Sequence, residues 1–121
     1  MKKILAVISI ILLFATAAVA ADWAKGSGAR AASAAISTKS GVLCQVIISS
    51  ASTNAVTLDL YDNPSAGSGT KLIPTWIVPA QATVGGIYTL NIADERFGSG
   101  LYAAVTSSGG FSYVVIYRED K

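Results

Sequence analysis

The chain has 121 residues, with nine basic and seven acidic side chains, one cysteine and no histidine. The missing histidine removes the commonest proton shuttle and transition-metal ligand, which excludes Ser-His-Asp triads, His-bound zinc and Cys-His nucleophiles. A single cysteine allows no intrachain disulfide, and the length fits one domain held together by its core or by partners.

Residues 1–20 have the pattern of a secretory signal peptide. Lys2 and Lys3 form a basic n-region, residues 4–14 form an apolar h-region, and Ala18-Val19-Ala20 supplies a small-x-small cleavage motif. We expect a hydrophobic signal helix, cleavage after this motif, and export to the periplasm, the cell surface or the medium. The alternative is a retained membrane anchor, because the segment is just long enough to span a bilayer. A membrane contact is expected only through this segment, if it stays uncleaved.

The formal charge of +2 depends on that segment. Without Lys2 and Lys3, seven basic residues balance seven acidic ones. A neutral chain without a basic stripe has little attraction for nucleic acid, so no nucleic-acid partner is predicted.

The rest of the chain is predicted to contain a flexible leader, residues 21–38, and one domain, residues 39–121. The leader begins without periodicity, although Trp23 offers an anchor. The small, polar stretch Arg30–Thr38 has the alanine content of a helical turn. Its serine and threonine content favours a weak first strand instead.

Two apolar, β-branched runs joined by a Ser/Thr/Asn-rich turn form the predicted centre of the domain, within Val42–Leu72. Period-two alternation indicates strands with one buried face. The residues expected to face the core are Val42, Cys44, Val46 and Ile48 in the first run and Val56, Leu58 and Leu60 in the second. Cys44 is then a small buried hydrophobe, the alternative being an intermolecular disulfide.

A turn-rich loop, Asn63–Gly69, follows these runs. Thr70–Val78 is predicted as a strand, and Pro74 confines it to a sheet edge or a bulge because proline cannot donate a ladder hydrogen bond. Ile87–Ala93 then alternates as a half-buried strand. Its inward residues are predicted to be Tyr88, Leu90 and Ile92.

Two more strands are predicted, Leu101–Thr106 and Phe111–Arg118, after turns at 94–100 and 107–110. With the weak first strand this gives about seven short strands. The sequence therefore predicts an all-β fold after the signal helix, an antiparallel β-sandwich of jelly-roll or immunoglobulin-like type.

Acidic residues offer few pairs for acid–base catalysis on glycosides. Asp59 and Asp62 lie three positions apart on a strand and so point to opposite faces. Asp94 and Glu95 adjoin Arg96 in a predicted turn. The loop after Asp62 lacks the alternating oxygen ligands of a calcium loop, and no phosphate-binding motif occurs. We predict no enzyme activity, no cofactor and no metal.

The last strand is apolar on both faces, because Val114 and Ile116 share the face opposite its aromatic residues. One face must meet the core, and the other would then be an exposed apolar strip that marks a contact surface. The candidate contact surface is Phe111, Tyr113, Val115 and Tyr117, for self-association or binding to other structural proteins. The alternative is that the leader or a loop covers the exposed part.

A second candidate site is a stacking platform for a glycan, because tyrosine and tryptophan combine a flat apolar body with a polar tip. Its candidate residues are Tyr61, Trp76 and Tyr102. This site would make the chain a carbohydrate- or surface-binding adhesin module.

The stretches LYDNPSAGSGTKL (Leu60–Leu72) and FGSGLYAAVTSSGGFSYVVIYRED (Phe97–Asp120) resemble a small β-sandwich module of tailed-phage virion and prophage structural proteins. In that module a strand ending in Tyr-Asp-Asn precedes a Ser-Gly-Thr loop, and a Gly-Leu strand precedes a closing Val-Ile-Tyr strand. KSGVLCQVIISS (Lys39–Ser50) is similar to its first core strand. The resemblance implies a non-enzymatic decoration, fibre or appendage subunit. Virion proteins assembled in the cytoplasm need no export signal, so the signal points to a cellular protein with this module or an exported phage-encoded one.

Together these observations predict an exported, non-catalytic subunit that assembles through its surfaces.

Overall fold

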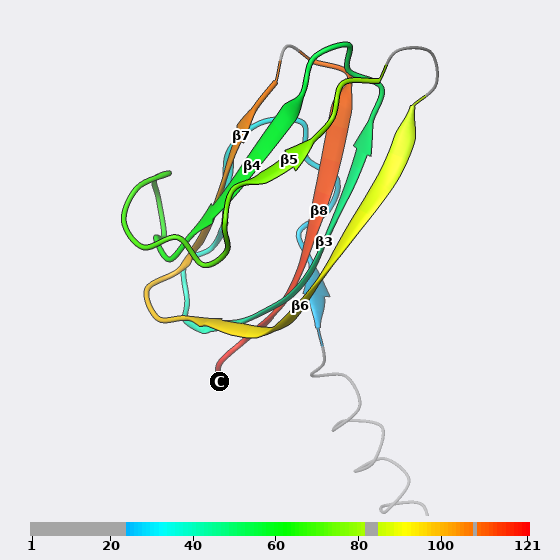
Figure 1. The fold of residues 1–121 in the computed structure, drawn as a ribbon. Coiled ribbons are helices and arrows are strands. Elements are labelled where there is room, and N and C mark those ends of the chain that lie inside the picture. The colour runs from blue at the N-terminus through cyan, green and yellow to red at the C-terminus, as the bar shows by residue number, and fades with distance from the viewer. Residues whose placement is uncertain (1–23, 82–84, 108) are drawn as a thin grey trace, which may run out of the picture.

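The structure, a computed structural model, describes residues 24–81, 85–107 and 109–121, so the predicted signal segment and Trp23 lie outside the described residues. Within these ranges the chain forms two antiparallel four-stranded sheets, and the predicted all-β fold is confirmed (Figure 1). The described residues include no helix that is long and apolar enough to cross a membrane.

Eight strands are found in the described part of the chain. Sheet A has the order β1-β8-β3-β6, with the bounds β1 Lys25–Gly26, β8 Phe111–Glu119, β3 Gly41–Ser50 and β6 Gly86–Phe97. Sheet B has the order β2-β7-β4-β5, with the bounds β2 Ala34–Ser37, β7 Leu101–Thr106, β4 Val56–Tyr61 and β5 Trp76–Val78. The antiparallel pairs are nested, because the first strand pairs with the eighth, the second with the seventh, the third with the sixth and the fourth with the fifth.

The two sheets enclose one hydrophobic core in a sandwich-like arrangement. Alternate residues of each strand point inward, as expected for sheets with one buried face. Sheet A contributes Leu43, Val46, Ile48, Phe97, Tyr113, Val115 and Tyr117, and sheet B contributes Val56, Leu58, Leu60, Val78, Leu101 and Ala103. The predicted inward face of Val56, Leu58 and Leu60 is confirmed.

The inward face of β3 differs from the prediction, because a β-bulge at Cys44 interrupts the alternation. The register of β3 shifts between Leu43 and Gln45 against both of its neighbours. Such a bulge adds one residue to the strand and reverses the face of everything beyond it. Leu43 is therefore fully buried in place of Val42, while Val46 stays inward. Cys44 is only partly buried, so its predicted place in the core is wrong.

The opposite strand β6 runs through the predicted turn at 94–96 and ends at Phe97. Asp94 takes a left-handed backbone conformation, with φ at 50°, next to the register shift. Aspartate tolerates this conformation better than most residues. The turn itself is limited to residues 98–100. The predicted inward face of Tyr88, Leu90 and Ile92 is confirmed by their half-burial.

β5 is shorter than predicted and starts after Pro74. It is the edge strand of sheet B, as the proline required. Before it, Lys71 makes only an isolated bridge to Tyr61. Pro74 and Pro79 lie on either side of β5 and limit this edge to three paired residues.

Part of the predicted leader joins the sheets. Lys25–Gly26 pairs with β8 in sheet A, and Ala34–Ser37 pairs with β7 in sheet B. The weak first strand is thus present, and the leader is not separate from the domain.

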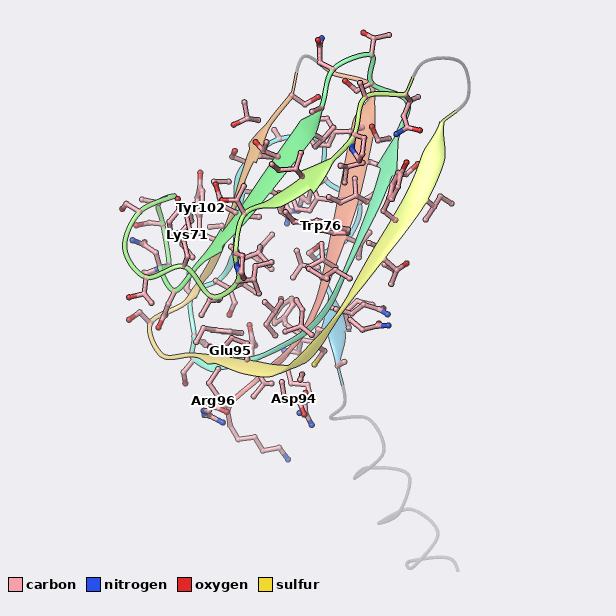
Figure 2. All side chains as sticks on the ribbon, in the orientation of Figure 1. Lys71, Trp76, Asp94, Glu95, Arg96 and Tyr102 are labelled. Atoms are coloured by element: carbon pink, nitrogen blue, oxygen red, sulfur yellow. The ribbon has the colours of Figure 1, made fainter. Side chains whose placement is uncertain are left out.

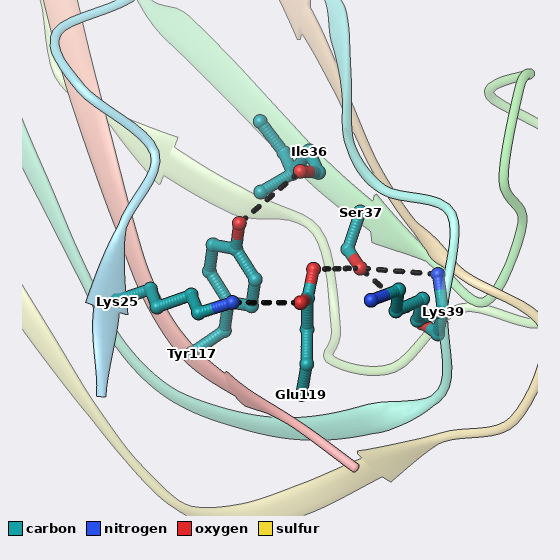
Figure 3. A network of polar contacts seen from close by, with 6 residues as sticks. All are labelled: Lys25, Ile36, Ser37, Lys39, Tyr117 and Glu119. Carbon is teal, nitrogen blue, oxygen red and sulfur yellow. Dashed lines mark hydrogen bonds and ion pairs between the residues drawn. The ribbon is translucent and has the colours of Figure 1, made fainter. Parts of the chain in front are cut away.

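Glu119 joins these N-terminal segments to the end of β8 (Figure 3). One carboxylate oxygen lies 2.9 Å from Lys25 Nζ, and the other accepts a hydrogen bond of 2.9 Å from Ser37 Oγ. These hydrogen bonds, that from Lys25 first, lower the pKa of Glu119 below its ordinary value. Nearby, the Tyr117 hydroxyl donates to the Ile36 carbonyl. Both sheets are therefore tied to the last strand at this end.

The position of the bulge leads to a testable prediction about substitutions at the neighbouring residues Val42 and Leu43. Leu43→Ala removes a fully buried side chain and is expected to lower the free energy of unfolding by about 2–5 kcal/mol. Val42→Ala, at the partly exposed neighbour, is expected to cost less than about 1 kcal/mol. Urea denaturation followed by tryptophan fluorescence measures both values. A larger loss for Val42→Ala would contradict the bulge.

Candidate functional site

The candidate contact surface predicted on β8 lies in the core and not on the outside. Tyr113 and Val115 are at most 1% exposed, and Tyr117 is 7% exposed. The Tyr113 hydroxyl donates to the Ala32 carbonyl at 2.7 Å, and burial raises its pKa to about 12. Phe111 is partly buried and stacks on Tyr113. The prediction chose the wrong face of this strand, because both faces are apolar and alternation alone does not say which faces inward.

The three aromatic residues predicted to stack on a glycan do not form one platform. Tyr61 and Tyr102 are register partners on the outer face of sheet B. Trp76 pairs with the buried Leu58 and therefore shares its inward face. Figure 2 shows Trp76 well apart from Tyr102, toward sheet A.

Trp76 instead lines a pocket of about 360 Å³ at one side of the molecule. The pocket opens between β5 and β6, which are the edge strands of the two sheets. Its lining is Ile73, Pro74, Thr75, Trp76, Leu90, Asn91 and Ile92. Leu90 and Ile92 remain partly exposed here because no described strand covers them. We call the pocket together with the adjoining edge of β6 the open side.

The backbone of β6 leaves a row of hydrogen-bonding groups on the open side. Ala51 N donates to Gly110 O at 2.7 Å, so the backbone groups of Ala51 face β8. Backbone groups alternate along an antiparallel ladder, and those of Ser50, Ile48 and Val46 therefore face β6.

Their register partners on β6 are Gly86, Tyr88 and Leu90. The N–H and C=O groups of Ile87, Thr89 and Asn91 consequently face away from sheet A. Within the described part of the chain, no backbone bond to them is found outside the sheet ladders.

The other three sheet edges are protected against pairing. β1 has two residues, β2 carries a register shift, and β5 has three residues between Pro74 and Pro79. β6 has twelve residues, and its first eight, Gly86–Ala93, contain no charge and no proline. Natural proteins use short strands, prolines, bulges and charges to block edge pairing. Within β6, only the far end has such protection, through its bulge and its charged residues.

Large apolar side chains are exposed on both strands of the open side. Ile87 on β6 is 75% exposed and Ile77 on β5 is 59% exposed. Single exposed apolar residues are common, but these two flank an apolar pocket and a free strand edge. The arrangement is suited to contact with another protein surface.

A polar cluster lies on the outer face of sheet B beside Tyr61. Asp59 accepts a 2.6 Å hydrogen bond from Thr75 and lies 2.9 Å from Lys71 Nζ. Burial alone would raise the pKa of Asp59, but the contacts with Thr75 and Lys71 outweigh it and lower the pKa. Lys71 Nζ is 5.8 Å from the Tyr61 ring centroid. This cluster presents a charged pair and aromatic rings together.

Asp62 and Asn63 hold the loops at the end of this cluster. The Asp62 carboxylate accepts hydrogen bonds from the backbone N–H groups of Gly98, Ser99 and Gly100, which lower its pKa. Asn63 Oδ1 accepts from the backbone of Ser65 and Ala66 and closes an Asx turn. The predicted turn role of Asn63 is confirmed, while Asp62 binds a different loop.

The contact between these loops also requires glycine. A Cβ at Gly100 would lie 2.5 Å from Pro64 Cα. A backbone atom cannot move aside easily, so position 100 tolerates only hydrogen.

Two further acidic groups, Asp94 and Asp120, are also engaged. Asp94 contacts Arg118, and Asp120 forms an ion pair with Arg96 at 2.8 Å. Among the described residues, no group of three or more metal-ligating side chains gathers in one place.

Comparison with known proteins finds no matching family model, no similar curated protein and no similar solved structure.

Asp62→Asn should destabilise the fold, because the amide offers one neutral oxygen where the carboxylate accepts from three N–H groups. We expect a loss of about 1–2 kcal/mol at pH 7. A lowered pKa in the folded state stabilises it above about pH 4, and this contribution is lost as pH falls through the folded value. The free energy of unfolding of Asp62→Asn should therefore fall less than that of wild type as the pH is lowered.

Urea denaturation between pH 2.5 and 7 measures the difference. Asp94→Asn is the matched control, because Asp94 is 68% exposed and makes one long contact with Arg118. Equal pH profiles for wild type and Asp62→Asn would refute the role of Asp62.

Proposed function

We propose that this chain is an exported, non-catalytic structural or surface-assembly subunit that acts through protein–protein contacts on its open side. The observation that carries the proposal is the unprotected stretch Gly86–Ala93 at the edge of sheet A. An exposed, uncharged edge of this length is a template for another strand. The adjoining pocket around Trp76 supplies apolar surface to bury at the same contact.

The nested strand pairing supports a jelly roll over an immunoglobulin-like fold. An immunoglobulin domain groups its first, second, fifth and fourth strands in one sheet and its third, sixth and seventh in the other. Here the sheet orders are β1-β8-β3-β6 and β2-β7-β4-β5. They arise because the first half of the chain pairs antiparallel with the second half, strand by strand from the two termini inward. Jelly rolls build both capsid and lectin domains, so the fold is compatible with assembly and with sugar binding.

The state of the carboxylates favours a role without catalysis. Acid–base catalysis on a glycoside needs two carboxyl groups on either side of one site. Asp59 is held by Thr75 and Lys71, and Asp62 is held by the backbone of the 98–100 turn. Asp59 and Asp62 are therefore each bound by their own structural partners, and no contact joins the two carboxylates.

A second candidate function is carbohydrate binding at the outer face of sheet B. Tyr61, Tyr102 and Lys71 lie next to Asp59 there, which gives aromatic faces beside hydrogen-bonding groups. Protein sites for sugars combine these two features. Trp76 is not part of this candidate site, because it faces the core side.

The leading proposal predicts that the exported protein assembles. Mass spectrometry of the purified exported chain should show an N-terminus at Ala21, after the expected cleavage motif. Size-exclusion chromatography with light scattering should show dimers or larger species as concentration rises. A chain that stays monomeric and purifies without any protein partner would refute the proposal.

The carbohydrate alternative predicts a different pattern. On a glycan array, Tyr102→Ala should remove binding because it deletes one stacking ring at the outer face of sheet B. Trp76→Ala should leave glycan binding unchanged. Absence of binding by the wild-type protein would eliminate this alternative, and loss of binding only in Trp76→Ala would move the site to the pocket.

A further inference from the structure

We propose that the partner at the open side is a second copy of this chain, joined through an antiparallel pairing of β6 with β6 about a two-fold axis at Thr89. This inference rests on the proposed function and names the partner for the open side. The two copies of sheet A would form one continuous eight-stranded sheet, with β1 at each outer edge.

The free backbone groups determine this register. In the part of the neutral stretch that keeps its register with β3, Gly86–Asn91, the residues that present N–H and C=O groups outward are Ile87, Thr89 and Asn91. An axis at Thr89 places Thr89 opposite Thr89 of the second copy, and Ile87 opposite its Asn91. Three directly opposed pairs then form, with about six backbone hydrogen bonds, because each pair exchanges two. An axis at Tyr88 or Leu90 would leave one of these three residues unpaired.

The same register closes the pocket. Side chains directly opposite in an antiparallel pair lie on the same face, about 5 Å apart. Tyr88 of one copy would therefore meet Leu90 of the other on the inward face. Leu90 and Ile92 line the pocket and are only half-buried within one copy. The second copy would thus cover the apolar surface that the two sheets leave open.

Charge favours an identical partner over a charged one. Gly86–Ala93 is neutral, so two copies meet without repulsion. Beyond it, Asp94 contacts Arg118 and Arg96 contacts Asp120 within one chain, so these charges are already paired. The bulge next to Asp94 bends β6 and stops the pairing at that point. The contact is therefore limited to one short, self-complementary segment.

The surface area that the dimer would bury sets the affinity expected between the two copies. Eight residues of strand span about 27 Å, and the side of a two-sheet sandwich is roughly 20 Å thick. Each copy would bury on the order of 500 Å², about 1,000 Å² in total, which is at the low end for specific interfaces. We expect a reversible dimer with a dissociation constant in the micromolar range and not an obligate one.

A pair of charge variants tests the register. Ile87→Lys with Asn91→Glu places opposite charges across the interface, twice per dimer. Ile87→Lys with Asn91→Lys places like charges there. Within one chain the two positions are about 13 Å apart, beyond the screening length at physiological salt, so the variants differ mainly between copies. Sedimentation equilibrium should show a dimer about tenfold tighter for the first variant than for the second.

The control is Ala35→Lys with Thr106→Lys, which adds two charges on exposed positions of sheet B. Its dimer dissociation constant should be within about twofold of the wild-type value.

Backbone amide exchange gives an independent measurement. Amide hydrogen exchange at Ile87 and Thr89 should slow as protein concentration rises, while Tyr88 is protected at all concentrations.

The outcomes separate the two proposals. Assembly by light scattering with equal dissociation constants for both charge variants refutes the β6 pairing and leaves the proposed function standing. A monomer whose exchange does not depend on concentration also refutes the pairing. In that case co-purification of the exported chain with another protein keeps the proposed function, and its absence refutes both.

Discussion

The bulge at Cys44 is the constraint on which the rest of the structure depends. β3 is an inner strand of sheet A, and its register shifts at Cys44 against both neighbours. Cys44 is one extra residue against β8, whereas three residues of β6, Ile92–Asp94, lie opposite it. Beyond the bulge Val46 and Ile48 point inward, and before it Leu43 does. At the same irregularity Asp94 takes a left-handed conformation, and β6 changes there from a neutral, regular part to a charged, bent part. The change of the inward face of β3 and the end of the unprotected edge of β6 therefore lie at one place in sheet A.

Most strands could be predicted because their alternation and turns are local properties. Leu101–Thr106 has the predicted bounds, and the last strand differs by one residue. The bulge could not be predicted, since Val42 and Leu43 are equally apolar and either phase satisfies the pattern. The same ambiguity on β8 led to the wrong choice of a contact surface at Tyr113, because a strand with two apolar faces does not show which one is buried.

The open side could not be predicted from the sequence, although two residues of its pocket, Leu90 and Ile92, were correctly expected to face inward. Trp76 was predicted in a different site, the glycan platform, because its aromatic character alone does not indicate its neighbours. The meeting of these residues at an uncovered flank depends on β5 and β6 both being edge strands, which is a property of the order of strands in the sheets. Strand order follows from long-range pairing, and a local pattern contains no information on it. Pro74 was the one local signal, because it limits β5 to an edge.

The nested pairing has a consequence for when the fold can form. β8 lies between β1 and β3, and β7 lies between β2 and β4, so each sheet lacks an inner strand until the final third of the chain is available. A polypeptide emerging from the ribosome can make the local β4–β5 contact early, but neither layer is complete before β8 has emerged. Such non-local contacts make folding slow and late. Both layers of the sandwich would therefore be completed together, only once the last two strands, β7 and β8, are available.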